Sequence, residues 1–287
     1  MTALTPIDLL HAGLERRIGS YVIDTDDGLA LFDCGPSSTL QALEDGLTER
    51  GLSLADVSHL LLSHIHPDHA GAAGAIVLAH PHVQVHVSEI GAPHLVDPGR
   101  LEASARRLYG DVFDELWGSL TPVPHENVHV VGDDALGLEA FPTPGHAAHH
   151  VSYLDAEGTL YSGDAAGARF APARFVMPPL PPPEVDLEAW ERTLVETERR
   201  APSRLALVHF GVFDDVESHL ERLRETMHRW AEWVAHGMDE PTFCAAARAD
   251  VAASDPDEVD RYGDLIPFWH CYRGLERYWT KRMAVVS

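Results

Sequence analysis

The segment His-Ile-His-Pro-Asp-His at residues 64–69 places three imidazoles and one carboxylate within six positions. Neutral imidazole and carboxylate groups are the nitrogen and oxygen ligands that zinc and iron prefer. The apolar run 57–63 directly before the segment predicts a β-strand, so the histidines should stand at a strand end. A histidine-rich surface turn is the alternative interpretation. It is less favoured because further candidate ligands occur later in the chain.

The spacing within this segment allows two metal positions. Side chains two residues apart on an extended chain point the same way, so His64 and His66 can share one metal ion. Asp68 and His69 lie beyond Pro67, where the chain leaves the strand, and they can turn towards a second ion. The segment therefore offers ligands for a pair of ions but completes neither coordination sphere.

Further candidate ligands occur at three later places, each where a strand-like run meets a glycine-containing turn. They are His146 in Thr-Pro-Gly-His, Asp164 in Tyr-Ser-Gly-Asp, and His209 in Leu-Ala-Leu-Val-His-Phe-Gly. Loops of this kind carry function on a rigid sheet. Taken alone, either histidine is more simply a packed or surface residue, but together these side chains complete two coordination spheres.

The ordered set of motifs resembles the metallo-β-lactamase-fold hydrolase superfamily. The matching pieces are the segment 64–69, Thr-Pro-Gly-His at 143–146, Gly-Asp at 163–164, and His209. The strand pair and Cys-Gly turn within residues 21–35 also look like the opening of the family. The resemblance implies a fold and a metal site, and it leaves the substrate open.

The fold that the resemblance implies is α/β (α+β): a four-layer αβ/βα sandwich of two mixed β-sheets with helices outside and metals along one edge. The runs in the sequence agree, with helices expected near 37–50, 70–78, 101–120 and 187–199, and strands near 20–24, 28–33, 57–63, 83–87, 127–131, 136–141, 149–154, 158–162 and 204–209. We expect a catalytic domain over residues 1–213 and a C-terminal helical extension over residues 214–287, packed on the same unit. Whether the extension caps the active-site edge or forms a dimer surface stays open at this level.

Carried over residue by residue, the resemblance implies a dinuclear metal site. Seven side chains would share two ions: His64, His66 and His146 on the first, Asp68, His69 and His209 on the second, and Asp164 as a bridge beside a shared water or hydroxide. Metal pairs of this kind lie roughly 3.5–4 Å apart and lower the pKa of the shared water towards about 7. Asp68 would also orient the attacking hydroxide. Zinc is the first expectation for the two divalent ions, and iron or manganese suits the same ligands.

Two further residues are candidates for the surroundings of these ligands. Asp33 stands at a strand end and can accept the second N–H of a metal-bound imidazole, with a turn-forming aspartate as the alternative. His150 matches a histidine that follows the ligand loop in the family, and it can hydrogen-bond around the metals.

The proline-rich stretch 169–183 follows the expected bridging residue and predicts a stiff, extended loop. Its position suggests a substrate wall. The candidate contacts are apolar side chains and an arginine for a substrate carboxylate, namely Phe170, Phe175, Met177 and either Arg169 or Arg174. A packed connector to the next helix is the alternative.

The composition limits the classes of partner and the cellular location that we expect. The 287-residue chain has a formal net charge of −24, which argues against nucleic acid. No apolar run approaches the roughly 20 residues that span a bilayer, and no targeting segment is apparent. The three cysteines lie far apart and form no disulfide framework. We therefore expect a cytoplasmic protein with a small-molecule substrate, no nucleic-acid or membrane partner, and a homodimer as an open option.

The first functional hypothesis is a dinuclear metal hydrolase for an ester, thioester or lactone. A histidine at position 66, where a glutamate would mark the oxygen-reducing flavodiiron branch, argues against that branch. The second hypothesis is a mononuclear-iron persulfide dioxygenase, which would bind iron through His64, His146 and Asp164. A phosphodiesterase of the same fold and a non-catalytic binding module are further alternatives.

Overall fold

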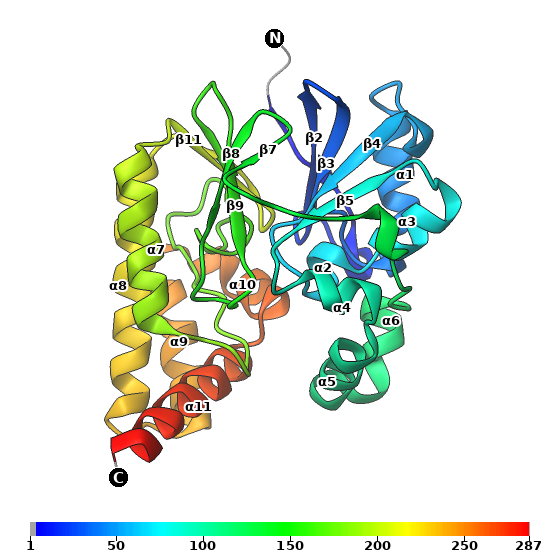
Figure 1. Cartoon of the computed structure of the whole chain (residues 1–287). Coiled ribbons are helices and arrows are strands. Elements are labelled where there is room, and N and C mark those ends of the chain that lie inside the picture. Colours follow the sequence, from blue (N-terminus) through cyan, green and yellow to red (C-terminus); the bar gives the residue numbers. More distant parts are fainter. Residues whose placement is uncertain (1–3, 287) are drawn as a thin grey trace.

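The computed structural model describes residues 4–286 as two β-sheets packed face to face, with helices on the outside (Figure 1). Each sheet has six strands. The first contains, in spatial order, β1 (Ile7–Asp8), β2 (Gly19–Thr25), β3 (Gly28–Phe32), β4 (Val57–Leu61), β5 (Gln84–Val87) and β6 (Val128–Val130). The second contains β12 (Gly211–Phe213), β11 (Arg204–Leu207), β10 (Thr159–Tyr161), β9 (Val151–Leu154), β8 (Leu138–Pro142) and β7 (Asp134–Ala135).

Both sheets are mixed, which confirms the expected architecture. Strands β3, β4, β5 and β6 run parallel, whereas β1, β2 and β3 are joined by antiparallel pairing. In the second sheet β10 and β11 are parallel and the other neighbours are antiparallel. Because parallel strands end at the same edge of a sheet, the loops after β3 and β4 emerge side by side, as do those after β10 and β11.

Eleven α-helices surround the sheets within residues 4–286. In chain order they are α1 (Leu40–Thr48), α2 (Pro67–Ala70), α3 (Ala73–Ala79), α4 (Ala92–Val96), α5 (Gly99–Tyr109), α6 (Phe113–Trp117), α7 (Leu187–Arg200), α8 (Val216–Ala235), α9 (Glu240–Ser254), α10 (Val259–Leu265) and α11 (Phe268–Val286). Short 3-10 turns add η1 (His11–Gly13), η2 (Ser37–Thr39), η3 (Leu54–Asp56), η4 (Gly110–Val112), η5 (His125–Asn127) and η6 (Pro256–Glu258). No helix in the described range is long and apolar enough to cross a membrane.

The helices begin and end for local reasons. The carboxylate of Asp186 caps α7 by accepting a hydrogen bond from the backbone N–H of Ala189 at 2.9 Å, and Asp239 caps α9 in the same way. The single helix expected over 101–120 is instead α5, η4 and α6. Gly110 adopts a φ of 59° where α5 stops, and such a left-handed conformation ends an α-helix.

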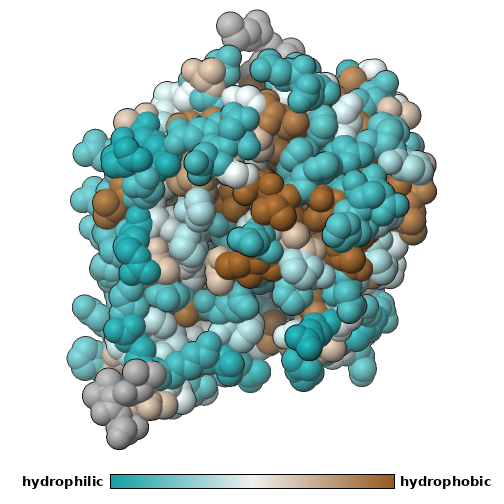
Figure 2. All heavy atoms as spheres, in the orientation of Figure 1, coloured by the Kyte–Doolittle hydropathy of each residue, from teal (hydrophilic) through white to brown (hydrophobic). Residues whose placement is uncertain are grey.

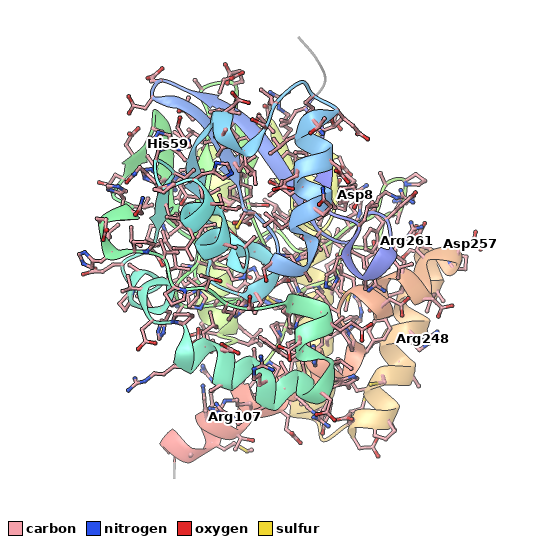
Figure 3. All side chains as sticks on the ribbon, turned by 90° about the vertical axis from the view of Figure 1, so that its right-hand side faces the viewer. Asp8, His59, Arg107, Arg248, Asp257 and Arg261 are labelled. Carbon is pink, nitrogen blue, oxygen red and sulfur yellow. The ribbon has the colours of Figure 1, made fainter. Side chains whose placement is uncertain are left out.

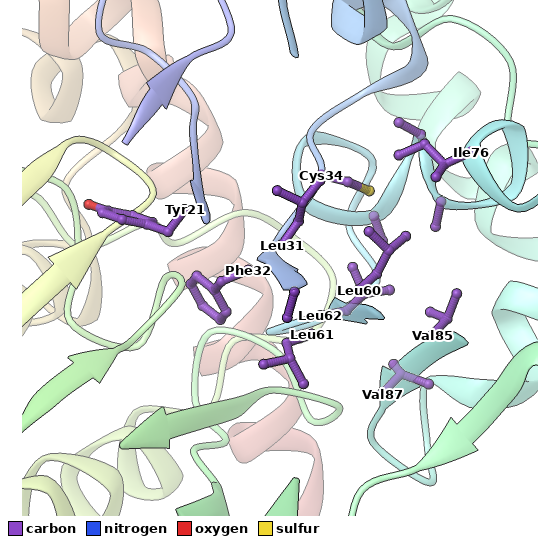
Figure 4. Close-up of a cluster of buried hydrophobic side chains, with 14 of the residues drawn as sticks. Tyr21, Leu31, Phe32, Cys34, Leu60, Leu61, Leu62, Ile76, Val85 and Val87 are labelled. Carbon is purple, nitrogen blue, oxygen red and sulfur yellow. The ribbon is translucent and has the colours of Figure 1, made fainter. Parts of the chain in front are cut away.

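Two apolar cores fill the molecule. The first lies within and behind the first sheet, where Phe32, Leu60 and Val85 are fully buried (Figure 4). The second lies between the second sheet and helices α7 to α11, and it includes Trp190 and Trp230. The C-terminal helices thus share a core with the second sheet. The outer face in Figure 2 is mostly hydrophilic, with hydrophobic residues gathered near its centre.

The proline-rich stretch 169–183 packs into the second core. The ring of Phe170 lies 4.8 Å from that of Tyr262, and Phe175 contacts both Tyr262 and Trp230. Of the other three candidate contacts, Met177 is fully buried and Arg169 is buried and bound to Asp215. Arg174 is exposed, and its backbone N–H donates to Asp255. These positions agree with the packed connector and not with a substrate wall, because the aromatic rings face α8 and α10.

Replacing Phe175 by Ala is expected to lower the free energy of unfolding by about 3–5 kcal/mol, because it leaves a cavity between α8 and α10. The exposed Val195 of α7 provides a control, and Val195→Ala should change that free energy by about 0.5 kcal/mol or less. Urea unfolding followed by circular dichroism measures both. An unchanged unfolding midpoint for Phe175→Ala would contradict its core position and reopen the substrate wall.

Candidate metal centre

The seven ligands expected from the sequence converge at one edge of the sandwich. Four come from the segment between β4 and α3, which includes the short helix α2, and the other three follow β8, β10 and β11. Their ligand atoms fall into three groups in which all atoms lie within 4.8 Å of one another: His64, His66 and His146; His64, His69 and Asp164; and Asp68, His69 and His209. The structure thus brings together residues that lie up to 145 positions apart, from His64 to His209.

The first group is a compact set of three imidazoles. Nδ1 of His66 lies 2.9 Å from Nε2 of His64 and 2.9 Å from Nε2 of His146. Zinc–nitrogen bonds are about 2.0–2.1 Å long, so nitrogen atoms this close can face one ion. His64 and His146 are buried, while His66 is half-buried and opens the group towards solvent.

The second group combines two imidazoles with a carboxylate. Oδ2 of Asp68 lies 3.6 Å from Nε2 of His69 and 3.5 Å from Nε2 of His209. The side chain of Asp68 is 24% exposed, whereas those of His69 and His209 are almost fully enclosed. Solvent therefore reaches this group from the side of Asp68.

Asp164 lies between the two groups. Its Oδ2 is 3.2 Å from Nε2 of His146, and its Oδ1 is 3.4 Å from Nε2 of His69 and 3.3 Å from Nε2 of His209. One carboxylate oxygen therefore faces each group, which is the arrangement of a carboxylate that can bridge two ions.

Hydrogen bonds on the far side of the imidazoles point their Nε2 atoms into the centre. His146 Nδ1 donates to the carbonyl of Pro179 at 2.8 Å, and His209 Nδ1 donates to the carbonyl of Arg17 at 2.6 Å. A carbonyl accepts only a proton-bearing nitrogen, so the Nε2 of each ring keeps its lone pair. Metal-bound histidines are usually held in this way.

Asp33 performs the same task from the end of β3. Its carboxylate accepts hydrogen bonds from His69 Nδ1, from the backbone N–H of Ser63 and from the Ser63 hydroxyl, each at 2.7 Å. The same hydroxyl lies 2.9 Å from His64 Nδ1 and can accept its proton. One buried carboxylate thus contacts His69 directly and His64 through the Ser63 hydroxyl.

His150 acts on the backbone of the bridging residue. Its Nε2 accepts a hydrogen bond from the backbone N–H of Asp164 at 3.1 Å, and its Nδ1 can donate to the Thr143 hydroxyl at 2.7 Å. A Cβ on Gly163 would lie 2.7 Å from this Nε2, and Gly163 has a φ of 48°. The glycine before Asp164 is therefore required by both conformation and space.

A second glycine positions His146. Gly145 has a φ of 145°, and a Cβ there would lie 2.3 Å from the side chain of Trp190. The Trp190 indole N–H in turn donates to the carbonyl of Ala165, next to the bridging residue. Close contact between α7 and this turn thus fixes two ligand loops at once.

The charges at the centre suit a cation. Burial lowers the pKa of His64 and His66, and the neighbouring imidazoles add to this effect, so both rings are neutral. Burial would raise the pKa of Asp68, but His69 and His209 outweigh it and hold that pKa below its usual range. Burial would lower the pKa of His69 and His209, but Asp164 and Asp68 outweigh it and raise both, so a divalent transition metal would displace protons from these two rings.

Two buried atoms at the centre lack a hydrogen-bond partner among residues 4–286. They are His69 Nε2 and Asp164 Oδ1, both of which point between the ligand groups. An unsatisfied buried polar atom costs about 1–3 kcal/mol. A bound cation would satisfy both atoms, so the residues present fit a metal site.

An aromatic wall stands beside Asp68, and the sequence analysis did not identify it as part of the site. It comprises His11, Trp117, Tyr109 and His270, which come from η1, α6, α5 and α11. The His11 ring stacks on Trp117 at 4.9 Å, and Tyr109 packs edge-on against Trp117 at 5.1 Å and His270 at 5.4 Å. Only Tyr109 and Trp117 carried a signal, as part of a helical apolar stripe.

Three polar groups of this wall have no hydrogen-bond partner within the part of the chain that the structure describes. Trp117 Nε1 and His270 Nε2 are buried, whereas the hydroxyl belongs to the half-buried Tyr109. Burial and the nearby charge of Asp68 raise its pKa, so the phenol keeps its proton and remains a donor.

Known proteins with similar sequences identify the family of this chain. Residues 16–211 match the family model of the metallo-beta-lactamase superfamily. The metallo-beta-lactamase fold-containing protein ST1585 of Sulfurisphaera tokodaii is 27% identical over 207 residues, which cover 66% of this chain and 76% of that protein. The uncharacterized protein YobT of Bacillus subtilis (strain 168) is 26% identical over 221 residues, which cover 74% of this chain and 90% of that protein.

Among solved structures, the metallo-beta-lactamase family protein TTHA1429 from Thermus thermophilus superposes with a TM-score of 0.64 at 22% identity, over 93% of this chain and 89% of that chain. TTHA1623, solved in a di-iron-bound form, superposes with a TM-score of 0.56 at 23% identity, over 76% of this chain and 98% of that chain. At such identities these likenesses show the fold alone. Since the family model spans more than half of the sequence, the chain belongs to the metallo-beta-lactamase superfamily.

Proposed function

We propose that the protein is a metal-dependent hydrolase with two divalent ions, zinc foremost, that cleaves an ester, thioester or lactone bond of a small molecule. The observation that carries the proposal is the position of Asp164, with one carboxylate oxygen facing each of two ligand groups. When bound, such ions lower the pKa of a water molecule and polarise the scissile carbonyl group.

The side chains of the protein supply the remaining functions. Asp33, Pro179 and Arg17 fix the orientation of the ligand imidazoles through their oxygen atoms. Asp68 is the carboxylate of the centre that solvent reaches, so it is placed to orient an attacking water and to accept its proton. We therefore assign Asp68 the catalytic role in addition to its role as a ligand.

The aromatic wall favours a substrate with an apolar body. His11, Trp117 and His270 are buried, but Tyr109 is half-buried, so its ring can contact an apolar substrate and its hydroxyl can donate to a substrate oxygen. The net charge of −24 disfavours a polyanionic substrate, so a small neutral carbonyl compound is a better fit than a nucleic acid. The three cysteines are free, as the reducing cytoplasm would keep them, and we place the protein there.

A mononuclear-iron persulfide dioxygenase is the second candidate. It would use His64, His146 and Asp164 and would leave the second group without a metal-binding role. The ligand atoms of Asp68, His69 and His209 also lie within 4.8 Å of one another, and this favours two ions.

The proposal is tested by quantifying metals in protein purified without chelator and then assaying lactones, thioesters, esters and phosphodiesters. We expect two equivalents of metal and hydrolysis of a carbonyl ester that a chelator abolishes. The variant Asp164→Ala should lose metal and activity together, because it removes an oxygen ligand from both groups. Asp257→Ala, at an exposed position labelled in Figure 3, is the control and should keep both.

The opposite results are specific. One iron per chain with oxygen uptake and no hydrolysis would favour the dioxygenase. Full turnover by Asp164→Ala would refute the bridging role.

Replacing Asp33 by Asn should weaken metal binding without unfolding the protein. The substitution keeps the side-chain shape, and asparagine tolerates the φ of 52° found at this position. It removes the charge that orients His69, and the loss of such an outer partner typically lowers metal affinity about 10–100-fold. Competition with a chromophoric chelator measures the affinity, and the exposed Asp24→Asn serves as control. Equal affinities in both variants would show that Asp33 is only a turn residue.

Replacing Tyr109 by Phe should lower kcat/KM about tenfold, the effect of losing one hydrogen bond of roughly 1.4 kcal/mol. Metal content should stay the same, because Tyr109 is not a ligand. Tyr272→Phe, which removes an exposed hydroxyl on α11, should leave kcat/KM unchanged. If both variants behave alike, the Tyr109 hydroxyl does not meet the substrate.

A further inference from the structure

Three histidines outside the metal centre lie side by side on one face of the first sheet. His59, labelled in Figure 3, is on β4, His86 is on β5 and His129 is on β6, which are consecutive parallel strands. His86 pairs with His129 in register, and His59 pairs with Gln84, two positions before His86 on the same face. The ring centroids are 5.2 Å apart from His59 to His86 and 5.3 Å apart from His86 to His129. We call these three residues the histidine row.

Two nitrogen atoms of the row already lie at the separation of two ligands of one ion. Nδ1 of His59 is 3.1 Å from Nε2 of His86. Metal–nitrogen bonds of about 2.0–2.1 Å in a tetrahedral site place two nitrogen ligands roughly 3.3 Å apart. An ion can therefore enter between the two rings with little movement of either strand.

The far nitrogens of the outer rings are held as they are at the metal centre. His59 Nε2 lies 3.4 Å from the carbonyl of Asp27, and His129 Nε2 lies 2.7 Å from the side-chain oxygen of Gln84. Each oxygen requires a proton on Nε2, which leaves the Nδ1 lone pair of both rings free. Fixing a ring through its second nitrogen is the usual outer arrangement of a histidine ligand.

The central ring keeps its charge balance when an ion binds. With the His59 Nδ1 unprotonated, the proton of the 3.1 Å contact belongs to His86 Nε2. Transfer of that proton to His86 Nδ1 exposes the Nε2 lone pair, and the imidazole stays neutral. Burial, helped by His59 and His129, lowers the pKa of His86 to about 4, so this ring is not protonated at neutral pH.

Solvent can reach the row. His59 and His86 are half-buried and His129 is exposed. The net charge of −24 also attracts cations to the surface of the protein.

We propose that the histidine row is a second metal site, in which His59 Nδ1 and His86 Nε2 bind one nitrogen-preferring transition-metal ion such as Zn²⁺ or Ni²⁺. His129 stacks on His86 and stands beside this pair. Hard cations such as Mg²⁺ and Ca²⁺ prefer oxygen ligands and should not bind there. The site is independent of the proposed hydrolase activity, since it uses none of the ligands of the metal centre.

The test is calorimetric titration of Ni²⁺ into the full-length protein loaded with zinc at its metal centre, with an indicator that reports zinc release. We expect one equivalent of Ni²⁺ to bind without zinc release. The variant His86→Gln should lower the Ni²⁺ affinity by at least about tenfold. Removing a residue that only hydrogen-bonds to a metal ligand typically costs about 10–100-fold, and His86 is itself a ligand. His125→Gln, which alters an exposed histidine outside the row, is the matched control and should bind Ni²⁺ like the unmodified protein.

A second variant guards against loss of folding. If His86→Gln proves unstable, His59→Gln removes the other ligand and should give the same loss of affinity. The proposal is overturned if the unmodified protein binds no Ni²⁺ beyond displaced zinc, or if the row variants and His125→Gln bind it equally. Tight Mg²⁺ binding abolished by His86→Gln would contradict the assigned ligand class.

Discussion

The metal centre depends on one constraint: its ionisable side chains are buried, and the protein supplies too few hydrogen-bond partners for them. Asp33 and Asp164 are almost fully buried together with four of the ligand histidines. Burying a charge is costly unless it is paired, and the hydrogen bonds of Asp33 to Ser63 and His69 meet that requirement. The backbone N–H of Asp164 donates to His150, while its carboxylate keeps one oxygen without a donor. The protein thus satisfies the hydrogen bonds on the outer side of the centre, whereas the atoms that face its interior would be satisfied by a cation.

The fold positions the ligands by attaching them closely to the two sheets. Five of the ligands stand within five residues of a strand end, and Asp68 and His69 lie in the short helix α2 that follows β4, so the rigid sheets determine where the ligands lie. Glycines at 145 and 163 let the chain turn in spaces where a side chain would collide with Trp190 or His150. These contacts connect the second core to the ligand loops, so the packing of α7 against the second sheet contributes to the geometry of the centre.

Much of this arrangement could be predicted, for identifiable reasons. The segment 64–69 combines ligand chemistry with strand spacing, and both signals are local. His146, Asp164 and His209 carry little signal singly and were predicted because their order resembles a known family. The aromatic wall could not be predicted, since His11 meets Trp117 only where η1 packs on α6, and His270 meets Tyr109 only where α11 packs near α5. The stretch 169–183 was ambiguous because aromatic residues after a ligand suit a substrate wall and a core equally well, and only the position of α10 decides between them.

The two sheets contribute unequally but jointly to the centre. The first supplies the ligands of the segment 64–69, and the second supplies the three that follow its own strands. Ions held there would act as a noncovalent cross-link between the N-terminal and C-terminal halves of the chain. The cooperativity of unfolding would then depend on whether the ions are bound. With the ions bound, the two halves would unfold as one unit. Without the ions, only the apolar interface would couple them.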